Sequence, residues 1–453
     1  MTGVARNAGD IPLAPGWPVI GNLPEMMSRP IDFLSEQYGS LGSVFRVNVA
    51  TKTYTVLAGA EANLLMSGAC RDRFSSRETW GRFVEKMDCP HLLIGSDGES
   101  HAYQRKLLKP FFARGNFRER YHCLVEVAKR RLDAVPNRTI RVAPFLRHLI
   151  CEQSGLILQD LAVDPDQSEA FINAQNTTLN VYMVGKWPRL AMLHPRYLYA
   201  QYKTNRFSNA LWRAHLEKPE QSRETYLDKV SHGRADRPEW FTDGDIHAHI
   251  MLPFIGGVDP AGGAMSFLLY ELLKQPALAQ RIRQEVDSFC EEGFPDFDML
   301  DEMEDLQGFI YEVLRLHPTG FVLSRTASQD ISFNGYRIPK GSELLVFNSA
   351  DHFNEKYFPS PRQFDIERYR EPRMEHKARA VFAPFGRGPH TCVGNALAEL
   401  MLKVNTIVLL RHYNMALKTP LHKLRTEYIP GPFMSKNFRI QLQPRRPSEV
   451  VVG

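Results

Sequence analysis

The run FGRGPHTCVG, residues 385–394, decides the fold of this chain. It holds a lone cysteine, Cys392, in a loop punctuated by Gly386, Gly388 and Gly394, which can take backbone conformations closed to other residues. The apolar stretch that follows predicts a helix directly after the loop. A sulfur at the positive N-terminal end of a helix is favoured as the thiolate, the form that binds a metal. The run therefore predicts a metal-binding thiolate beside a backbone against which a flat cofactor could lie.

A cysteine taken alone more often packs in a core without any chemistry. Here the surrounding residues favour a ligand, because the run resembles the signature of the cytochrome P450 family: Phe, two residues, Gly, one residue, Arg or His, one residue, Cys, one residue, Gly. The signature positions are filled by Phe385, Gly388, His390, Cys392 and Gly394. The chain is thereby similar to a haem-thiolate enzyme.

The resemblance implies a mainly α fold with a small β region, and a haem b (iron protoporphyrin IX) between a long central helix and the cysteine-loop helix. Cys392 would be the axial ligand of the iron, and its thiolate would push electron density onto the metal. Phe385 would pack near the sulfur and moderate its basicity. Gly386 would let the loop backbone approach the cofactor.

Length and composition agree with one large enzyme domain. The 453 residues are 43% hydrophobic and 24% charged, and we find no repeat or linker, so we expect a single domain over 1–453 with 1–10 flexible. The six cysteines lack any CxxC pair, which argues against a zinc site or a disulfide framework. No apolar run reaches 18 residues and the formal charge of +5 is mild, so we expect a soluble, cytoplasmic monomer without a membrane anchor or nucleic-acid partner.

Hydrophobic periodicity predicts mostly helices. Period-two alternation predicts strands at 42–49 and 53–59, within 330–348, and near 437–442. The predicted helices cover residues 30–39, 100–115, 117–133, 143–162, 166–184, 195–217, 243–275 and 276–291.

A second family feature lies in YEVLRLHP, where Glu312 and Arg315 stand three apart on one helix face and can pair. Alone this would be an ordinary surface ion pair. The later segment FDIERYR resembles the family segment whose arginine completes a buried Glu, Arg, Arg network, and Arg368 would be that arginine. The implied role is structural, and removing one partner would leave an uncompensated buried charge.

A haem carries two propionates, which need cations or donors. The resemblance implies four of them: His101 and Arg105, four apart on one predicted helix; Arg325, on a strand after the Glu–Arg helix; and His390, two residues before the cysteine. The alternative for each is a solvated charge or a satisfied histidine.

The predicted long helix, residues 243–275, departs from the family. The family pattern on this haem-crossing helix is a small residue, Gly, any residue, Asp or Glu, Thr, and Thr or Ser. The chain has Gly256, Gly257, Val258, Asp259, Pro260 and Ala261 in those positions. The acid is present and the alcohol is missing. We expect Pro260 to kink the helix and to free the carbonyls of Gly256 and Gly257, because proline lacks an N–H and crowds the preceding turn.

The missing alcohol leaves several reactions open. A positioned proton-transfer group contributes about 10² to 10⁴ in rate. The substrate itself, or a water held by the substrate and the Gly256 carbonyl, could replace the alcohol. The enzyme could instead use peroxide, or act as an isomerase or dehydratase on an oxidised substrate. Asp259 and Pro260 could also simply cap and kink a helix in an enzyme that tolerates the change.

Substrate contacts are inferred only from family positions, and together they describe an apolar, aromatic-rich pocket. These positions hold Trp80, Phe83, Met87, Leu93, Ile255, Val258, Phe321, Val322, Phe433 and Met434. Each could equally be generic core. The segment 180–202, with aromatics among Lys186, Arg189 and Arg196, corresponds to the family's mobile channel roof, and it could also touch a carrier protein or a lipid surface.

We expect an oxidoreductase, a monooxygenase or atypical oxidase, acting on an apolar small molecule in specialised metabolism. A ferredoxin or flavodoxin would supply electrons at a basic face near the cysteine, where an acidic partner would be steered. The basic residues near that face are Arg373, Lys377, Arg379, Arg387 and Lys403. The rival class, a haem-binding protein without turnover, is disfavoured by the retained Asp259.

Overall fold

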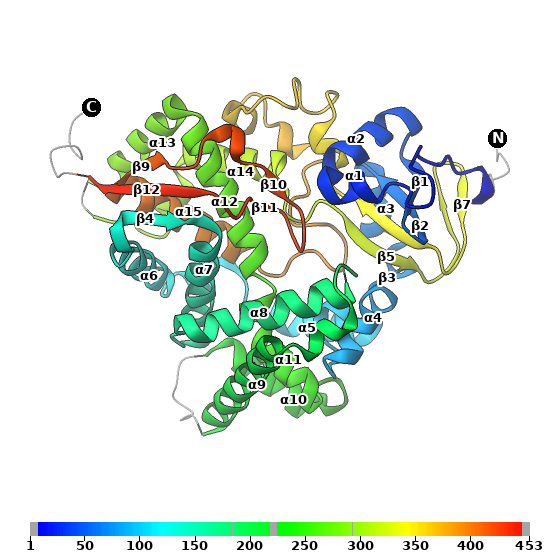
Figure 1. The fold of residues 1–453 in the computed structure, drawn as a ribbon, viewed down its shortest axis with the longest axis horizontal. Coiled ribbons are helices and arrows are strands. Elements are labelled where there is room, and N and C mark those ends of the chain that lie inside the picture. The colour runs from blue at the N-terminus through cyan, green and yellow to red at the C-terminus, as the bar shows by residue number, and fades with distance from the viewer. Residues whose placement is uncertain (1–7, 184, 218–223, 292, 446–453) are drawn as a thin grey trace. The chain divides into compact units, whose positions relative to one another are not determined.

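The computed structural model describes residues 8–183, 185–217, 224–291 and 293–445 (Figure 1). The expected flexible N-terminus falls largely on residues 1–7, which lie outside the described residues; residues Ala8–Asp10 form a short 3₁₀ turn. The chain divides into two compact units. Unit 1 comprises Met1–Glu85, Pro90–Tyr103 and Leu314–Cys392, and unit 2 comprises Lys86–Cys89, Gln104–Val313 and Val393–Gly453. The single-domain prediction therefore stays a prediction.

Unit 1 is built on a five-stranded sheet in the order β1-β2-β8-β5-β3. Its strands are β1 (Val44–Val49), β2 (Lys52–Ala58), β3 (Phe74–Ser75), β5 (Leu323–Ala327) and β8 (Glu343–Phe347). The predicted pair β1 and β2 is antiparallel with Val44 opposite Leu57, whereas β2 pairs with β8 in parallel. A parallel partner comes from a distant part of the chain, so residues near 345 join a sheet that residues near 50 begin.

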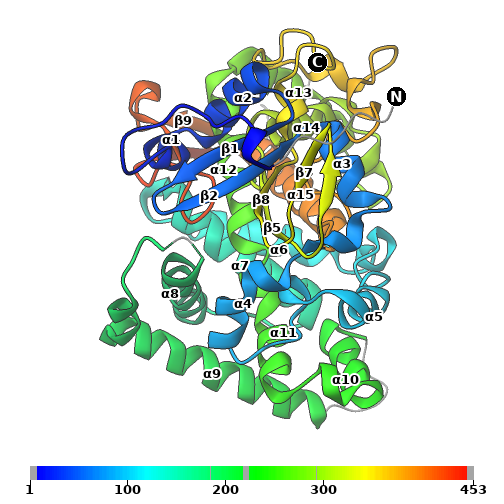
Figure 2. The same cartoon turned by 90° about the vertical axis from the view of Figure 1, so that its right-hand side faces the viewer.

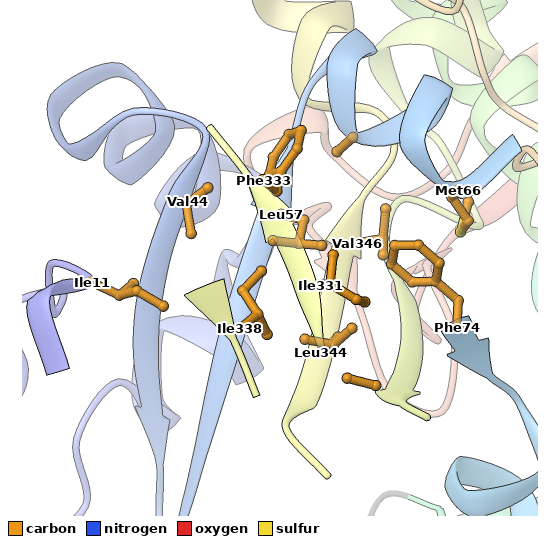
Figure 3. Close-up of a cluster of buried hydrophobic side chains, with 12 residues drawn as sticks. Ile11, Val44, Leu57, Met66, Phe74, Ile331, Phe333, Ile338, Leu344 and Val346 are labelled. Atoms are coloured by element: carbon orange, nitrogen blue, oxygen red, sulfur yellow. The ribbon is translucent and has the colours of Figure 1, made fainter. Parts of the chain in front are cut away.

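The sheet's core forms because alternate side chains of these strands are apolar. Val44, Leu57, Leu344 and Val346 are buried in one cluster, together with Phe74 (Figure 3). The β6–β7 hairpin (Ile331–Phe333 and Tyr336–Ile338) also contributes to it. The helices of this unit are α1 (Leu23–Ser28), α2 (Pro30–Leu41), α3 (Ala60–Ser67) and most of α4 (Arg77–Lys86).

Unit 2 is mainly helical. Its helices are α6 (Tyr121–Asp133), α7 (Val142–Gln159), α8 (Pro165–Tyr182), α9 (Pro195–Leu216), α10 (Tyr226–Asp236), α11 (Asp243–Ile255), α12 (Val258–Lys274), α13 (Pro276–Phe289) and α15 (Asn395–His412). Local sequence sets their starts: Asp164 and Gln167 form a capping box at α8, and Thr242 and Asp245 form one at α11. The predicted helices at 143–162, 166–184, 195–217 and 276–291 are confirmed by α7, α8, α9 and α13. Figure 2 shows α9 running beside α8.

Three helices cross the boundary between the units: α4 at its last residue, Lys86, and the helices α5 (Gly98–Leu108) and α14 (Glu304–Leu316). The helix predicted at 100–115 ends at Leu108, because Pro110 disfavours helical backbone in the residue before it. The helix predicted from 117 begins at Tyr121, after a short 3₁₀ turn at Arg114–Phe117. Helices α4 and α10 were not predicted, since both are short.

The long helix predicted over 243–275 is present as the helical stretch Asp243–Lys274 with one interruption: α11 ends at Ile255 and α12 begins at Val258, while Gly256 and Gly257 keep right-handed helical φ and ψ. The break falls at Gly256 and Gly257, the residues with the least preference for a helix interior. Pro260 consequently lies in the first turn of α12, where its missing N–H is not needed. The interruption thus lies one turn before Pro260, at the carbonyl of Gly256 to which the proline cannot donate, as expected.

Small strands complete unit 2: β4 (Thr139–Arg141), β12 (Arg439–Pro444) and β9 (Tyr413–Leu417) form one sheet, and β10 (Thr426–Glu427) pairs with β11 (Phe433–Met434). Among the described residues, one helical stretch, Asp243–Lys274, is long and apolar enough to cross a membrane, and 71% of its most apolar window is buried within the protein. The core helix of a soluble protein passes the same test, so this is weak evidence for a span.

Candidate functional site

The cysteine run forms a tightly closed loop in unit 1. The N–H of Cys392 donates to the carbonyl of Phe385 at 3.0 Å, and the N–H of Thr391 donates to the carbonyl of Gly388 at 3.1 Å. Cys392 is in no disulfide, and it is the one cysteine of the six whose side chain is exposed. It precedes α15 by three residues, so the predicted helix after the loop is confirmed with a start at Asn395. A closed loop with an outward-facing sulfur is suited to hold a metal from one side.

Two glycines of this loop permit its backbone path. Gly386 and Gly388 have φ of 72° and 83°, in the left-handed region that favours glycine. A Cβ on Gly388 would lie 2.7 Å from the carbonyl oxygen of Met66, and one on Gly386 would lie 3.4 Å from Leu323. The loop therefore packs directly on α3 and β5 of its own unit.

His390 and His101, both predicted for the propionates, lie together. Their rings stack with centroids 3.9 Å apart. The Nε2 of His390 lies 3.2 Å from an oxygen of Asp97, which sequence reasoning did not assign. Its only signal was an Asp-Gly pair directly before a predicted helix.

Asp97 is held as a carboxylate. It accepts hydrogen bonds from the Ser75 hydroxyl at 2.8 Å and from the N–H groups of Ser76 and Arg77 at 2.9 Å each. Burial alone would raise the pKa of Asp97, but these bonds and the one from His390 outweigh burial and hold that pKa well below its usual range. The charged Asp97 thus orients His390 and ties the cysteine loop to the start of α4.

Arg325 lies on β5 with its guanidinium buried. Burial lowers the pKa of Arg325 to about 10, although the nearby Asp97 charge opposes the change, so the group remains a cation at neutral pH. One of its nitrogens donates to the Ser324 carbonyl at 2.7 Å, and within the described part of the chain no carboxylate forms an ion pair with it. A buried cation without an anionic partner is costly. The site suits an anionic group that arrives with a ligand.

These observations test whether a haem fits, and the residues present do fit. An exposed thiol in a closed loop, two glycines at close approach, a histidine pair and a buried cation all belong to unit 1. Arg105 is half-buried four residues after His101 on α5, in the part assigned to unit 2. The chemistry of this donor set matches a metal ligated by sulfur in a cofactor that bears carboxylates.

The predicted structural residues are buried, and their contacts extend the prediction. The guanidinium groups of Arg315 and Arg368 both donate to the Gln363 carbonyl, at 3.4 and 3.3 Å. Arg368 also pairs with Glu375 at 2.9 Å, a partner that the sequence did not indicate. Glu312 is fully buried on α14. The two arginines thus anchor the segment around Gln363 that leads toward the cysteine loop.

His352, another residue not predicted, connects these arginines to the loop. Its Nδ1 lies 3.2 Å from the Arg315 carbonyl, and its Nε2 accepts from the Ala383 N–H at 3.0 Å. The Ala383 carbonyl in turn accepts from the Gly386 N–H at 3.1 Å. Burial, assisted by the Arg315 charge, lowers the pKa of His352 to about 3, so the ring is neutral. The neutral imidazole of His352 therefore connects the backbone of Arg315 to the backbone that leads into the cysteine loop.

In unit 2, Asp259, the acid of the motif that differs from the family pattern, has a specific partner. Asp259 accepts from the Nε of Arg147 on α7 at 2.6 Å, and both side chains are mostly buried. The guanidinium of Arg147 also lies over the ring of Phe433, 4.8 Å from its centroid. Phe433 reaches α12 as well, since a Cβ on Gly262 would lie 3.3 Å from that ring. Asp259, Arg147 and Phe433 form one contiguous group.

The expectation that both glycine carbonyls are freed is wrong for Gly257, because its carbonyl accepts from the Ala261 N–H at 3.0 Å. Starting α12 at Val258 restores this helical bond. Gly256 faces Pro260, which has no N–H to donate. The prediction of a carbonyl without its helical hydrogen bond therefore holds for Gly256 alone of these two glycines.

The predicted substrate residues divide equally between the units. In unit 1, Trp80 and Phe83 make an edge contact on α4 with centroids 5.7 Å apart, and Leu93 is buried. Phe321 and Val322 pack against the sheet core, so they contribute to the stability of unit 1.

In unit 2, Val258, Phe433 and Met434 are buried, and Met87 is half-buried. The N–H of Met434 donates to the Ser266 hydroxyl on α12 at 3.1 Å, which fixes β11 to that helix. The side chain of Ile255 lies outside the described residues.

The basic residues expected near the cysteine do not all form a free surface. Lys403 is buried and pairs with Asp301 at 2.8 Å, so its place in a docking face is wrong. Arg373 is paired with Asp365 and Glu375. Lys377 and Arg379 are exposed, and Arg387 is half-buried.

Comparison with known proteins agrees with the site. The sequence model of the family described as "Cytochrome P450" matches residues 11–442. The chain is 26% identical over 328 residues to cyclooctat-9-en-7-ol 5-monooxygenase of Streptomyces melanosporofaciens, covering 69% of this chain and 70% of that protein. It is 31% identical over 212 residues to sterol 14alpha-demethylase of Mycolicibacterium vanbaalenii, covering 46% and 45%.

Among solved structures, the cytochrome P450DA heme domain superposes with a TM-score of 0.84 at 19% identity, covering 98% of this chain and 99% of that one. The predicted mainly α fold with a small β region is thereby confirmed. The family binds protoporphyrin IX haem b through a cysteine thiolate. With a family match over nearly its whole length, this chain belongs to the cytochrome P450 family and is a haem-thiolate oxidoreductase.

Proposed function

We propose that the chain is a monooxygenase of an apolar small molecule, with Cys392 as the axial ligand of the haem and with proton delivery by substrate or water. The observation that carries the proposal is the closed loop that presents Cys392 outward. It is supported by the buried Arg325, which forms no ion pair within the described residues. When bound, the haem supplies thiolate-supported activation of oxygen.

The residues of unit 1 hold the cofactor in this proposal. His390 is oriented by Asp97 and stacked on His101, so both imidazoles are fixed where they can bind one propionate. Arg325 can offer its planar fork to the other. Arg105 would join them from the next turn of α5. Phe385 and Gly386 shape the loop beside the sulfur.

Proton delivery must work without an alcohol on α12. Pro260 carries neither a hydroxyl nor an N–H, and the carboxylate of Asp259 is engaged by Arg147 at 2.6 Å. An ion-paired carboxylate can orient a water molecule while staying charged. We assign the final proton carrier to such a water beside Gly256 or to a polar group of the substrate.

Peroxide use on a fatty acid is less well supported. It would require a cation on α12 to bind the substrate carboxylate, but the nearby guanidinium of Arg147 is already neutralised by Asp259. An isomerase or dehydratase remains the alternative reaction class. Such an enzyme differs from a monooxygenase in that it turns over without an electron donor.

The axial ligand is tested by Cys392→Ser, with Cys123→Ser as the matched control at a half-buried cysteine. The reduced carbon monoxide complex of the wild type and the control should show the Soret band of thiolate ligation. Cys392→Ser should lose that band because an alcohol does not ligate as a thiolate. Retention of the band in Cys392→Ser would exclude this ligand.

The reaction is tested by supplying a ferredoxin, its reductase and NADPH, and by measuring oxygen uptake and product with candidate apolar substrates. A monooxygenase requires that substrate-dependent oxygen uptake and product appear together. Product without any electron supply would contradict the proposal and favour the isomerase class.

Two of the similar proteins are named for their substrates, cyclooctat-9-en-7-ol and a sterol. These names support the apolar substrate of the proposal, to which we add a role in specialised metabolism. We further propose a cytoplasmic monomer with a single domain and a ferredoxin or flavodoxin as electron donor, with exposed Lys377 and Arg379 available to an acidic partner.

A further inference from the structure

Helix α9 buries Tyr197 and the smaller Ala200, Thr204 and Ser208, and it leaves several large apolar side chains exposed. Toward α8 it places Ala200, which packs on Ala170 and Ala174. On its other side Leu198 and Tyr199 are each more than half exposed, as is Tyr202. A surface helix of a globular protein normally does the opposite. The outer face of α9 is therefore not explained by packing within the chain.

The turn before α9 continues this apolar surface. Leu190 and Leu193 are 73% and 65% exposed, and Trp187 is also exposed. Between them, Met192 is buried in a cluster with Tyr197, so the turn is anchored while its neighbours project outward. The roof patch is defined as Trp187, Leu190, Leu193, Leu198, Tyr199 and Tyr202. These six are among fourteen exposed large apolar residues of the described chain, concentrated in 187–202.

The segment that carries the roof patch has charges of one sign. From residue 185 to residue 216 the sequence holds six Lys or Arg and no Asp or Glu. Lys186 and Arg189 are exposed, and in the described part of the chain neither forms an ion pair. Lys203 lies over the Tyr199 ring, 5.3 Å from its centroid, so its stem can follow the apolar surface while its ammonium reaches solvent. Two of the six cations are paired with acids of α8, Arg196 with Glu169 at 3.0 Å and Lys203 with Asp166 at 4.0 Å. The unpaired Lys186 and Arg189, beside Trp187 and Leu190, give this end of the apolar patch a positive border that complements an anionic partner.

Two physical features favour a lipid surface over a protein. Leucines exposed by more than half project outward, so a protein partner would need a matching concavity, whereas a bilayer interface accepts projecting side chains. Trp and Tyr prefer the level of the headgroups, and Lys and Arg are attracted to anionic lipids. We propose that the roof patch binds the surface of an anionic phospholipid bilayer, lying in the interface without crossing it. This proposal does not depend on the reaction proposed above.

The test uses the haem-loaded protein and sedimentation with vesicles. Binding to vesicles of phosphatidylcholine with phosphatidylglycerol should exceed binding to phosphatidylcholine alone, and added salt should weaken it. Lys186→Gln and Arg189→Gln should each weaken binding to the anionic vesicles about fivefold, since each charge near such a surface contributes about 1 kcal/mol. The triple variant Leu190→Ser, Leu193→Ser, Tyr199→Ser should weaken it about tenfold or more.

The N-terminal segment supplies a matched control. Trp17, Val19 and Ile20 are also exposed and apolar, but Glu25 accepts a hydrogen bond from Trp17 there and the basic border is missing. Replacing these three with serine should leave vesicle binding unchanged. An equal loss in this control would overturn the proposal, as would a wild type that binds neither vesicle. Haem absorbance and thermal unfolding verify that each variant is folded.

Other occupants of the patch would give different results. The same leucine variant is compared with wild type for binding to a bacterial ferredoxin, as an acidic probe, and for self-association by sedimentation velocity. Weaker ferredoxin binding or dissociation of a dimer, with vesicle binding unaltered, would assign the patch to a protein and overturn the lipid proposal. The lipid proposal is supported if the charge variants and the triple variant weaken vesicle binding while the N-terminal control keeps it.

Discussion

Gly388 shows how a single missing side chain shapes the cysteine loop. Its φ of 83° resembles the 81° of Gly335, but only Gly388 has a neighbour, the Met66 carbonyl oxygen, at 2.7 Å from a Cβ position. Gly388→Ala should therefore cost the backbone strain of about 1 to 2 kcal/mol and, in addition, the displacement of α3. Gly335→Ala, with open space around it, should cost the strain alone. The free energy of unfolding in urea, measured for both variants, provides the comparison.

Equal losses in the two glycine variants would show that the close approach to Met66 is unimportant. Haem content gives a second measurement, because displacing the loop should lower it for Gly388→Ala only.

At the scale of elements, helices α7 and α12 are joined by the Arg147–Asp259 pair. Because both side chains are mostly buried, removing one leaves the other poorly solvated. A double-mutant cycle with Arg147→Gln and Asp259→Asn should give a coupling free energy of about 1 to 2 kcal/mol in unfolding experiments. The exposed pair Arg118–Asp298, treated in the same way, should give no measurable coupling.

A coupling near zero for Arg147 and Asp259 would mean that the pair does not hold the start of α12. The proposal that a fixed Asp259 carboxylate orients a water molecule would then be contradicted.

Pro260 also belongs to the element scale, because it lies in the first turn of α12, directly after the interruption of the long helix. Pro260→Thr should cost under about 1 kcal/mol of unfolding free energy, since the first helical turn tolerates either residue. If substrate or water already delivers protons, the new hydroxyl should change the turnover rate little or alter the product. A large rise in turnover, with the same product and the same coupling of oxygen to product, would contradict that assignment.

At the scale of the whole molecule, each unit buries a neutral histidine. Burial lowers the pKa of His352 to about 3 and that of His249 to about 4, and His249 lies 2.9 Å from the Tyr226 hydroxyl. Because the folded pKa is below the unfolded value, the unfolded chain binds more protons as the pH falls below about 6.5. Stability should fall by about 2 kcal/mol for each histidine between pH 7 and pH 5.

Urea unfolding at several pH values checks this slope. His352→Gln and His249→Gln should each make the slope shallower, because each removes one buried histidine. The rest of the slope comes from other histidines whose pKa burial lowers: His148, His247, His376 and His412. A wild-type stability that does not fall between pH 7 and pH 5 would contradict the buried neutral state.

Prediction from the sequence succeeded where the signal is local. The strand pair β1 and β2, the helices α7 to α9, and the helix after the cysteine follow from side-chain periodicity within one segment. The family signature around Cys392 is likewise contiguous, and it identified the fold. Local patterns did not fix where α11 ends and α12 begins, because two adjacent glycines and a proline leave the position of the break undecided.

The sequence alone determined the family, the thiolate candidate and the absence of an alcohol after Asp259, since each depends on the identity of neighbouring residues. Only the tertiary structure showed that Asp97 orients His390, that His352 connects Arg315 to the loop, and that Arg147 engages Asp259. These partners are more than a hundred residues apart or lie on different elements. Their contacts depend on long-range packing, which no local pattern encodes.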